Sequence, residues 1–233
     1  MIRFWRKLND LFGWAVILVF GFIMAVGIWQ VYDNYYIFDH ALDKDILKYK
    51  PDPDDPAAQV NSPITDEMVG WLTIDGTNID YPVMQGSDNT HFLNTDPFGS
   101  YSLTGSIFLD SRCSPDFSDG MSVVYGHHMD YGKMFGALDD FLTSEYLSKH
   151  TTGTLMVGRN AEKVYDLRVF AAARVSAREK IVFDMKQDEI RQYLRDNTRI
   201  IGGESDSRIL TLSTCADADS VSRIAVFCYI IDK

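Results

Sequence analysis

The chain has 233 residues, of which 46% are hydrophobic and 24% charged, and its formal net charge is −11 at pH 7. This length fits one domain of ordinary size with accessory segments, and the apolar share is that of a folded chain, which excludes global disorder. Nucleic-acid binding needs a basic surface, so the acidic balance excludes nucleic acid as a partner.

The first predicted element is an apolar helix, LFGWAVILVFGFIMAVGIW, over residues 11–29. These residues carry no charge and would span about 28 Å as a helix, close to the thickness of a bilayer's hydrocarbon core. A buried helix of a globular domain would show a polar stripe, and a cleaved signal peptide would have a shorter apolar core followed by small residues. We therefore expect a transmembrane signal anchor over residues 11–31.

The charges on either side of this anchor indicate its orientation. Arg3, Arg6 and Lys7 precede it, whereas Asp33 and Asp39 follow it. Positive residues favour the cytoplasmic side of a membrane. We expect a single-pass protein of the cell membrane, with residues 1–10 as a cytoplasmic tail and the rest of the chain outside the cell.

Two further regions follow the anchor. Residues 32–67 are expected to form a juxtamembrane helix and then an extended linker, because this region contains four of the chain's seven prolines. Residues 68–233 then show about eight short strand patterns broken by turn residues, which predicts a mainly β fold, a closed barrel or a sandwich. The strand patterns are VGWLTID, NIDYPVM, GSIFLD, MSVVYGHH, GTLMVG, KVYDLRVFAAARV, RILTLST and RIAVFCYII.

Two helices are predicted to interrupt these strands. KMFGALDDFL follows a pair of adjacent histidines, and DMKQDEIRQYLRDNTR has apolar residues at helical spacing. Asp184 is expected to cap the second helix at its N-terminus, with Gln187 three residues later in the manner of a capping box.

Strand alternation separates the cysteines. Leu210 and Leu212 share one side of their strand, and Thr211, Ser213 and Cys215 share the other. Cys215 is therefore expected on a mainly polar face at the surface. In the last strand the same rule places Cys228 in the core, where a cysteine is usually a small apolar residue. Cys113 lies in a predicted loop, and the sequence does not indicate whether it pairs with another cysteine.

A thiolate is a stronger nucleophile when a cation lies nearby, so the histidines matter for Cys215. Of the five histidines, only His127 and His128, in VVYGHHMDYG, end a strand beside a glycine, from which a side chain can reach a cleft. Alternation does not decide between the two, and a turn with two solvated imidazoles explains the pattern as well. Arg223, eight residues beyond Cys215, supplies a fixed positive charge.

Together these motifs resemble the sortases of Gram-positive bacteria, specifically class B. The resemblance rests on YGHHM, on TLSTC with an arginine shortly after it, and on IDYPVMQGSDN and GSIFLD upstream. It implies a closed eight-stranded barrel with peripheral helices over residues 68–233, and a cysteine transpeptidase activity. It also implies Cys215 as the nucleophile, His127 as the general acid and base, and Arg223 as the group that binds the oxyanion or the substrate.

The resemblance further implies the partners. Exported proteins with a C-terminal sorting motif would be cleaved at a threonine, and the acyl group would pass to the amine of a lipid-linked peptidoglycan precursor or of a pilin. Ser213, Tyr125 and Asn89 are the expected substrate contacts, and no metal or cofactor is needed. The alternatives are a pilin-polymerising sortase, an extracellular thiol protease or hydrolase that uses water as acceptor, and a non-enzymatic barrel that binds the wall.

Overall fold

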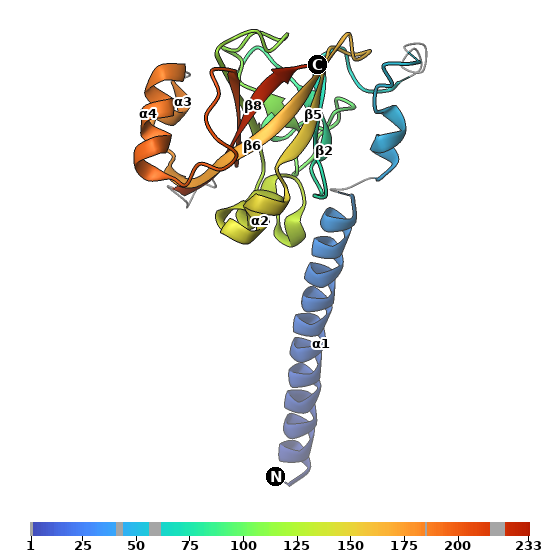
Figure 1. The fold of residues 1–233 in the computed structure, drawn as a ribbon. Coiled ribbons are helices and arrows are strands. Elements are labelled where there is room, and N and C mark those ends of the chain that lie inside the picture. Colours follow the sequence, from blue (N-terminus) through green and yellow to red (C-terminus); the bar gives the residue numbers. More distant parts are fainter. Residues whose placement is uncertain (1, 41–43, 56–61, 185, 215–221) are drawn as a thin grey trace. The chain divides into compact units, whose positions relative to one another are not determined.

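The computed structural model describes residues 2–40, 44–55, 62–184, 186–214 and 222–233 (Figure 1). The chain divides into two compact units, Met1–Ala41 and Leu42–Lys233. The first unit is one helix, α1 (Ile2–His40), and residues Ile2–Asp33 of it form a candidate membrane span of which none is buried. The predicted apolar helix is confirmed as such a candidate. It begins earlier than expected and runs without a break into the region expected to form a juxtamembrane helix, since residues 2–10 and 30–40 contain no proline or glycine that would stop it.

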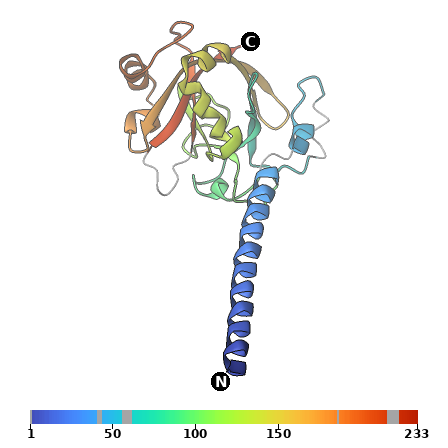
Figure 2. The same cartoon turned by 90° about the horizontal axis from the view of Figure 1, so that it is seen from below.

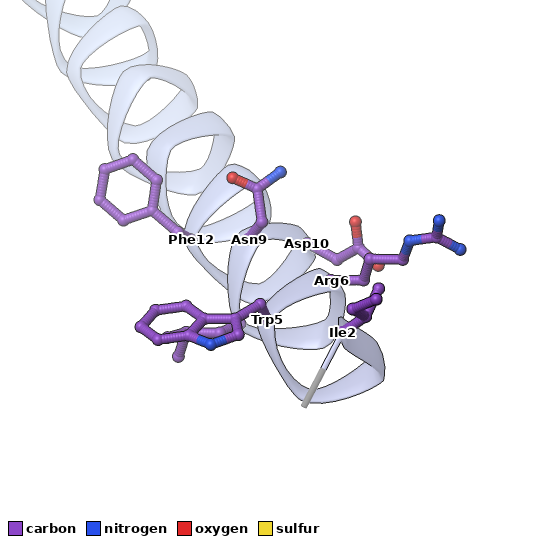
Figure 3. Close-up of a pocket in the computed structure, with 7 residues that line it drawn as sticks. Ile2, Trp5, Arg6, Asn9, Asp10 and Phe12 are labelled. Carbon is purple, nitrogen blue, oxygen red and sulfur yellow. The ribbon is translucent and has the colours of Figure 1, made fainter.

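The labelled aromatic and charged side chains at the start of α1 lie on different sides of the helix (Figure 3). Trp5 and Phe12 point to one side of the helix, and Arg6 and Asp10 point to the other (Figure 3). The hollow between them is lined by residues of α1 alone, so it is the space between side chains of one helix and not a cavity of the fold. Aromatic and basic residues together are typical of the region where a membrane meets water.

The second unit contains the predicted closed barrel, whose strands follow one another around it in the order β1-β2-β3-β4-β7-β8-β6-β5. Neighbouring strands are antiparallel except for β2 with β3 and β4 with β7, which are parallel. All eight predicted strands are present and the eight-stranded barrel is confirmed. The strands are β1 (Met68–Ile74), β2 (Asp80–Met84), β3 (Ile107–Leu109), β4 (Met121–Gly126), β5 (Thr152–Val157), β6 (Lys163–Ser176), β7 (Arg208–Thr214) and β8 (Ser222–Asp232).

Apolar side chains pack on both faces of the strands that follow β3. Leu210, Leu212 and Cys228 belong to the cluster inside the barrel. Ile209, Phe227 and other residues of the opposite face belong to a second cluster, which Ile190 and Leu194 of helix α4 (Gln187–Asn197) cover from outside. Figure 1 shows α4 beside β6 and β8. The expectation that the second face is a surface is therefore wrong for Thr211 and Ser213, both of which are fully buried.

The shorter helices lie between the strands. Both predicted interruptions are helical: the 3-10 helix η5 (Phe135–Leu142) and α4. Further helices among the described residues of this part are the 3-10 helices η3 (His91–Leu93) and η4 (Asp130–Gly132) and the α-helix α2 (Ser144–Lys149). The predicted cap is wrong, because a separate short helix, α3 (Lys180–Phe183), ends at Asp184, and Lys186 occupies the N-cap position of α4. Gln187 donates instead to the carbonyl of Ser207.

The segment before the barrel is fastened to it by two basic side chains. After the 3-10 helix η1 (Lys44–Tyr49), Lys50 Nζ lies 2.8 Å from both Asp80 Oδ1 and Thr73 Oγ1, and the Trp71 indole donates to the same carboxylate oxygen at 2.6 Å. Arg159 donates to the carbonyls of residues 62, 64 and 65. These two contacts hold the described ends of the predicted linker against β1, β2 and the turn after β5.

We predict that Lys50→Met lowers the free energy of unfolding by about 1–3 kcal/mol, because the half-buried Asp80 carboxylate loses a charged hydrogen-bond donor. Protease should then cleave residues 44–55 faster than in the wild type. Lys149→Met is the matched control, since its ion pair with Glu145 is exposed and should contribute less than about 1 kcal/mol. Chemical denaturation and limited proteolysis measure both effects. Equal losses in the two variants would show that Lys50 does not fasten the segment.

Candidate active site

Three neighbouring strands bring His127, Arg223 and the last described residue of β7 to one end of the barrel. Tyr125 of β4 pairs with Ser213 of β7, which pairs with Ala225 of β8. The β4–β7 ladder ends where Gly126 pairs with Thr214, and the Thr214 hydroxyl accepts a hydrogen bond from the backbone N–H of Ile224 at 3.0 Å. His127 directly follows β4, and Arg223 is the second residue of β8. Cys215 is the next residue in sequence after β7 and lies outside the described residues.

The two adjacent histidines have different partners. His127 is half-buried, and its Nε2 lies 2.7 Å from the carbonyl oxygen of Leu93. His128 Nε2 lies 2.9 Å from a carboxylate oxygen of Asp139, and that pair is substantially exposed. The first imidazole is thus held by the backbone of the loop between β2 and β3, whereas the second contacts a carboxylate at the surface.

The turn that follows His127 is closely packed against the barrel. The backbone carbonyl of His127 accepts a hydrogen bond from Phe135 N–H at 3.0 Å, and the buried Tyr81 hydroxyl accepts one from Met134 N–H at 3.1 Å. Burial raises the pKa of Tyr81 to about 12, so the hydroxyl stays protonated at neutral pH. A Cβ at Gly126 would lie 2.3 Å from Ile107 Cδ1 and 2.9 Å from the Phe135 ring, so only glycine admits this packing before the histidine.

The Arg223 guanidinium is held by aromatic rings. No carboxylate among the described residues pairs with it. Its central carbon lies 5.0 Å from the centre of the Phe183 ring and 5.8 Å from that of Tyr125. The two rings stack at an interplanar angle of 28°. The buried Nε of Arg223 has no hydrogen-bond partner in the described part of the chain. Rings orient the cation without occupying its N–H groups, which therefore remain available to an anionic or carbonyl oxygen.

A buried carboxylate supports these rings. Asp110 is fully buried, accepts two hydrogen bonds from the Arg112 guanidinium at 2.9 and 2.8 Å, and accepts one from the Tyr125 hydroxyl at 3.1 Å. Arg112 also donates to the Phe183 carbonyl at 3.0 Å. Burial works to raise the pKa of Asp110, but the hydrogen bonds and charge of Arg112 outweigh it and hold that pKa below its usual value. Asp110, Arg112 and Phe183 were not among the predicted site residues.

The three predicted substrate contacts differ in what they offer a ligand. Ser213 is fully buried and its hydroxyl donates to the Thr214 carbonyl at 3.1 Å. The Tyr125 hydroxyl is already bonded to Asp110, and burial together with that carboxylate raises its pKa. Asn89 is half-buried, and its side-chain oxygen accepts from Ser111 N–H at 2.7 Å, which leaves the amide N–H₂ to donate. Within the described residues, Asn89 is thus the one of the three whose side chain keeps an unoccupied donor.

The other two cysteines are buried thiols and are not joined to each other. Cys228 is confirmed as a core residue with no exposed surface, and burial raises its pKa. Burial likewise raises the pKa of Cys113 to about 11. A thiol held protonated in this way is a poor nucleophile, so neither residue is a good candidate for that role.

We predict that Asp110→Asn lowers the free energy of unfolding by about 2 kcal/mol at pH 7, because the charged hydrogen bonds between the buried carboxylate and the half-exposed Arg112 are lost. The lowered pKa of Asp110 means that the wild-type stabilisation is complete above the carboxyl's unfolded pKa and is lost as the pH falls through the folded one. The gap between wild type and variant should therefore narrow from pH 7 toward pH 3. Denaturant titrations across that range measure it, with Asp66→Asn, which removes an exposed carboxylate, as control. A constant gap would contradict the argument.

Comparison with known proteins agrees with this geometry. The sequence pattern of the sortase domain family matches residues 72–231. Sortase B of Staphylococcus aureus is 33% identical over 178 residues, which cover 72% of each chain. Its structure solved with a substrate superposes with a TM-score of 0.64 at 30% identity, covering 72% of this chain and 82% of that one.

A second solved structure is equally similar. A Streptococcus pyogenes class B sortase involved in pilus biogenesis has a TM-score of 0.65 at 32% identity, covering 76% of this chain and 96% of that one. The matched residues contain strands β2 to β7 in full and parts of β1 and β8, and the relatives on both the sequence and the structure side are class B enzymes. The chain therefore belongs to the sortase family of cysteine transpeptidases, and within that family to class B.

Proposed function

We propose that this protein is a membrane-anchored transpeptidase that cleaves a C-terminal sorting motif of exported proteins at a threonine and transfers the protein to the amine of a lipid-linked peptidoglycan precursor. The observation that carries the proposal is the convergence of the ends of β4 and β7 with the start of β8. In support of it, His127 directly follows β4 and Arg223 lies near the start of β8, and both strands are adjacent to β7, which ends at the residue before Cys215 in sequence. The apolar helix α1 would hold the enzyme in the membrane, with residues 1–10 in the cytoplasm.

The first half of the reaction forms a thioester. The Cys215 thiolate adds to the carbonyl carbon of the threonine, and the carbonyl electrons move onto its oxygen. Arg223 stabilises this oxyanion or holds the substrate peptide, since its N–H groups are oriented by rings and are not occupied by a carboxylate of the described chain. The imidazolium of His127 gives its proton to the departing nitrogen as the C–N bond breaks, and the amine leaves.

The second half reverses these steps with a new amine. The acceptor attacks the thioester carbonyl, neutral His127 takes a proton from its nitrogen, and the Cys215 thiolate leaves. One amide bond is broken and one is formed, so no cofactor or external energy source is needed. Asn89 has a free amide donor for the peptide backbone, whereas Ser213 and Tyr125 shape the site from beneath.

The test of this proposal uses the full chain in detergent with a panel of candidate sorting peptides. We expect cleavage after threonine, and diversion of the product from acid to amide when an amine acceptor is added. Cys215→Ala should be inert, and Arg223→Lys should lower turnover by about a hundredfold. Mass spectrometry identifies both products. A product that stays the free acid at every amine concentration would indicate a thiol hydrolase, and no cleavage of any peptide would favour a wall-binding barrel.

Assembly of pilins is a second candidate function, favoured by the similarity to the class B sortase of S. pyogenes that takes part in pilus biogenesis. The chemistry is the same and only the acceptor amine differs. The two are separated by competing a lysine side chain within a folded pilin-like protein against a peptidoglycan cross-bridge peptide. We expect the cross-bridge peptide to be the preferred acceptor.

The two histidines provide a separate prediction. His127→Ala should slow formation of the thioester by about a hundredfold or more, because the leaving amine loses its proton donor. His128→Ala should leave most of the rate, since that imidazole is engaged with Asp139 at the surface. Single-turnover acylation with a fluorescent peptide measures both rates. A larger loss in the His128 variant would reassign the general acid to His128.

A further inference from the structure

The bond between His127 and Leu93 determines which imidazole nitrogen can take part in catalysis. A carbonyl oxygen only accepts hydrogen bonds, so the His127 nitrogen 2.7 Å from it, Nε2, must carry a proton. That proton is present in both the neutral and the cationic ring. The nitrogen that gains and loses a proton during a reaction is therefore Nδ1, and the Leu93 carbonyl fixes the direction in which Nδ1 points.

The loop that carries Leu93 is held in place by its own hydrogen bonds. The Leu93 N–H donates to the Thr90 carbonyl at 3.2 Å, and the Ser106 N–H donates to the Phe92 carbonyl at 2.9 Å. The Ser106 hydroxyl donates to the Thr95 carbonyl at 2.7 Å. The turn that leads into β3 therefore packs directly against the peptide groups of Phe92 and Leu93. Phe92 itself is buried.

Gly105 is the residue at which this packing is closest. Its φ is +56°, and a Cβ there would lie 2.4 Å from the Phe92 oxygen and 2.5 Å from the Leu93 oxygen. Both atoms belong to the backbone, so a side chain at this position cannot be accommodated by a rotamer change. It would have to displace the carbonyl that accepts the hydrogen bond of His127.

We propose that the Leu93 carbonyl, kept in place because residue 105 is glycine, orients the His127 imidazole so that Nδ1 exchanges the proton in catalysis. Gly105 is then a positioning residue, far from His127 in sequence and acting on it through one peptide group. The catalytic half of this inference rests on the proposed function, whereas the hydrogen bond and its dependence on Gly105 do not.

The experiment compares Gly105→Ala with a matched variant in the same loop. Gly99 also has a positive φ, +80°, and a Cβ there would meet only the Thr65 methyl at 3.3 Å. Gly99→Ala therefore carries a similar backbone strain without touching the Leu93 carbonyl. The full chain in detergent is labelled with ¹⁵N-histidine, and the five histidines give a spectrum simple enough to assign with His127→Ala.

We expect wild type and Gly99→Ala to show one downfield, slowly exchanging Nε2–H signal that is absent from His127→Ala. Gly105→Ala should lose or shift this signal. In single-turnover acylation it should reduce the maximal rate by about a hundredfold with little change in the peptide concentration for half-maximal rate, since a displaced proton donor affects the chemical step more than binding. Gly99→Ala should acylate at close to the wild-type rate.

An unchanged Nε2–H signal in Gly105→Ala, or an equal change in Gly99→Ala, would overturn the inference. If Gly105→Ala does not fold, the hydrogen bond between His127 and Leu93 can be tested with residue 105 unchanged, in protein that contains ¹³C-carbonyl leucine. There, His127→Ala should shift the Leu93 carbonyl signal and His128→Ala should not. A wild type that cleaves no peptide but shows the expected spectra would overturn the proposed function alone. A normal acylation rate in Gly105→Ala despite a lost signal would overturn the catalytic half of the inference.

Discussion

The parallel ladder between β4 and β7 is the constraint on which the rest of the site depends. These strands are separated by more than eighty residues of chain, yet their last residues, Gly126 and Thr214, are direct partners. Because the two strands run in the same direction, whatever follows each of them emerges at the same end of the barrel. β8 then begins at that end because it is antiparallel to β7. Closure of the barrel fixes this arrangement, since no strand at the site is an edge that can slip.

The second constraint is electrostatic. Arg223 is a permanent cation beside an otherwise apolar cluster, and the simplest partner for it would be a carboxylate. Asp110 has other partners, because its two oxygens accept hydrogen bonds from Arg112 and Tyr125. It affects Arg223 only indirectly, by holding the Tyr125 and Phe183 rings that contact the guanidinium. A guanidinium paired directly with a carboxylate would have its N–H groups satisfied and would bind an oxyanion weakly. The buried charge of Asp110 thus stabilises the rings that hold Arg223 without neutralising the positive charge of Arg223.

Much of this arrangement could be predicted from residue patterns. All eight strands were predictable because apolar runs bounded by turn residues mark them, and Cys228 was assigned correctly to the core by alternation. Alternation failed for Thr211 and Ser213 because a polar residue on the second face signals solvent only when nothing covers that face. Here Ile190 and Leu194 of α4 belong to the same apolar cluster as Ile209 and Phe227, and the residue pattern of β7 itself gives no sign that a helix covers this face. The short helix α3 was missed for a related reason, since four residues carry no periodic signal.

The group that holds His127 could not be predicted from side-chain patterns at all, because it is a backbone carbonyl and every residue has one. A carbonyl nevertheless suits the proposed reaction, in which His127 acts as an acid in one half and as a base in the next. A carboxylate partner would favour the charged imidazole over the neutral one and so bias the two halves against each other. A neutral acceptor keeps the same Nε2–H bond in both states, so the ring need not turn when its proton leaves. The orientation of the ring is then set by the loop between β2 and β3, where the absence of a side chain at Gly105 determines how closely two peptide groups approach.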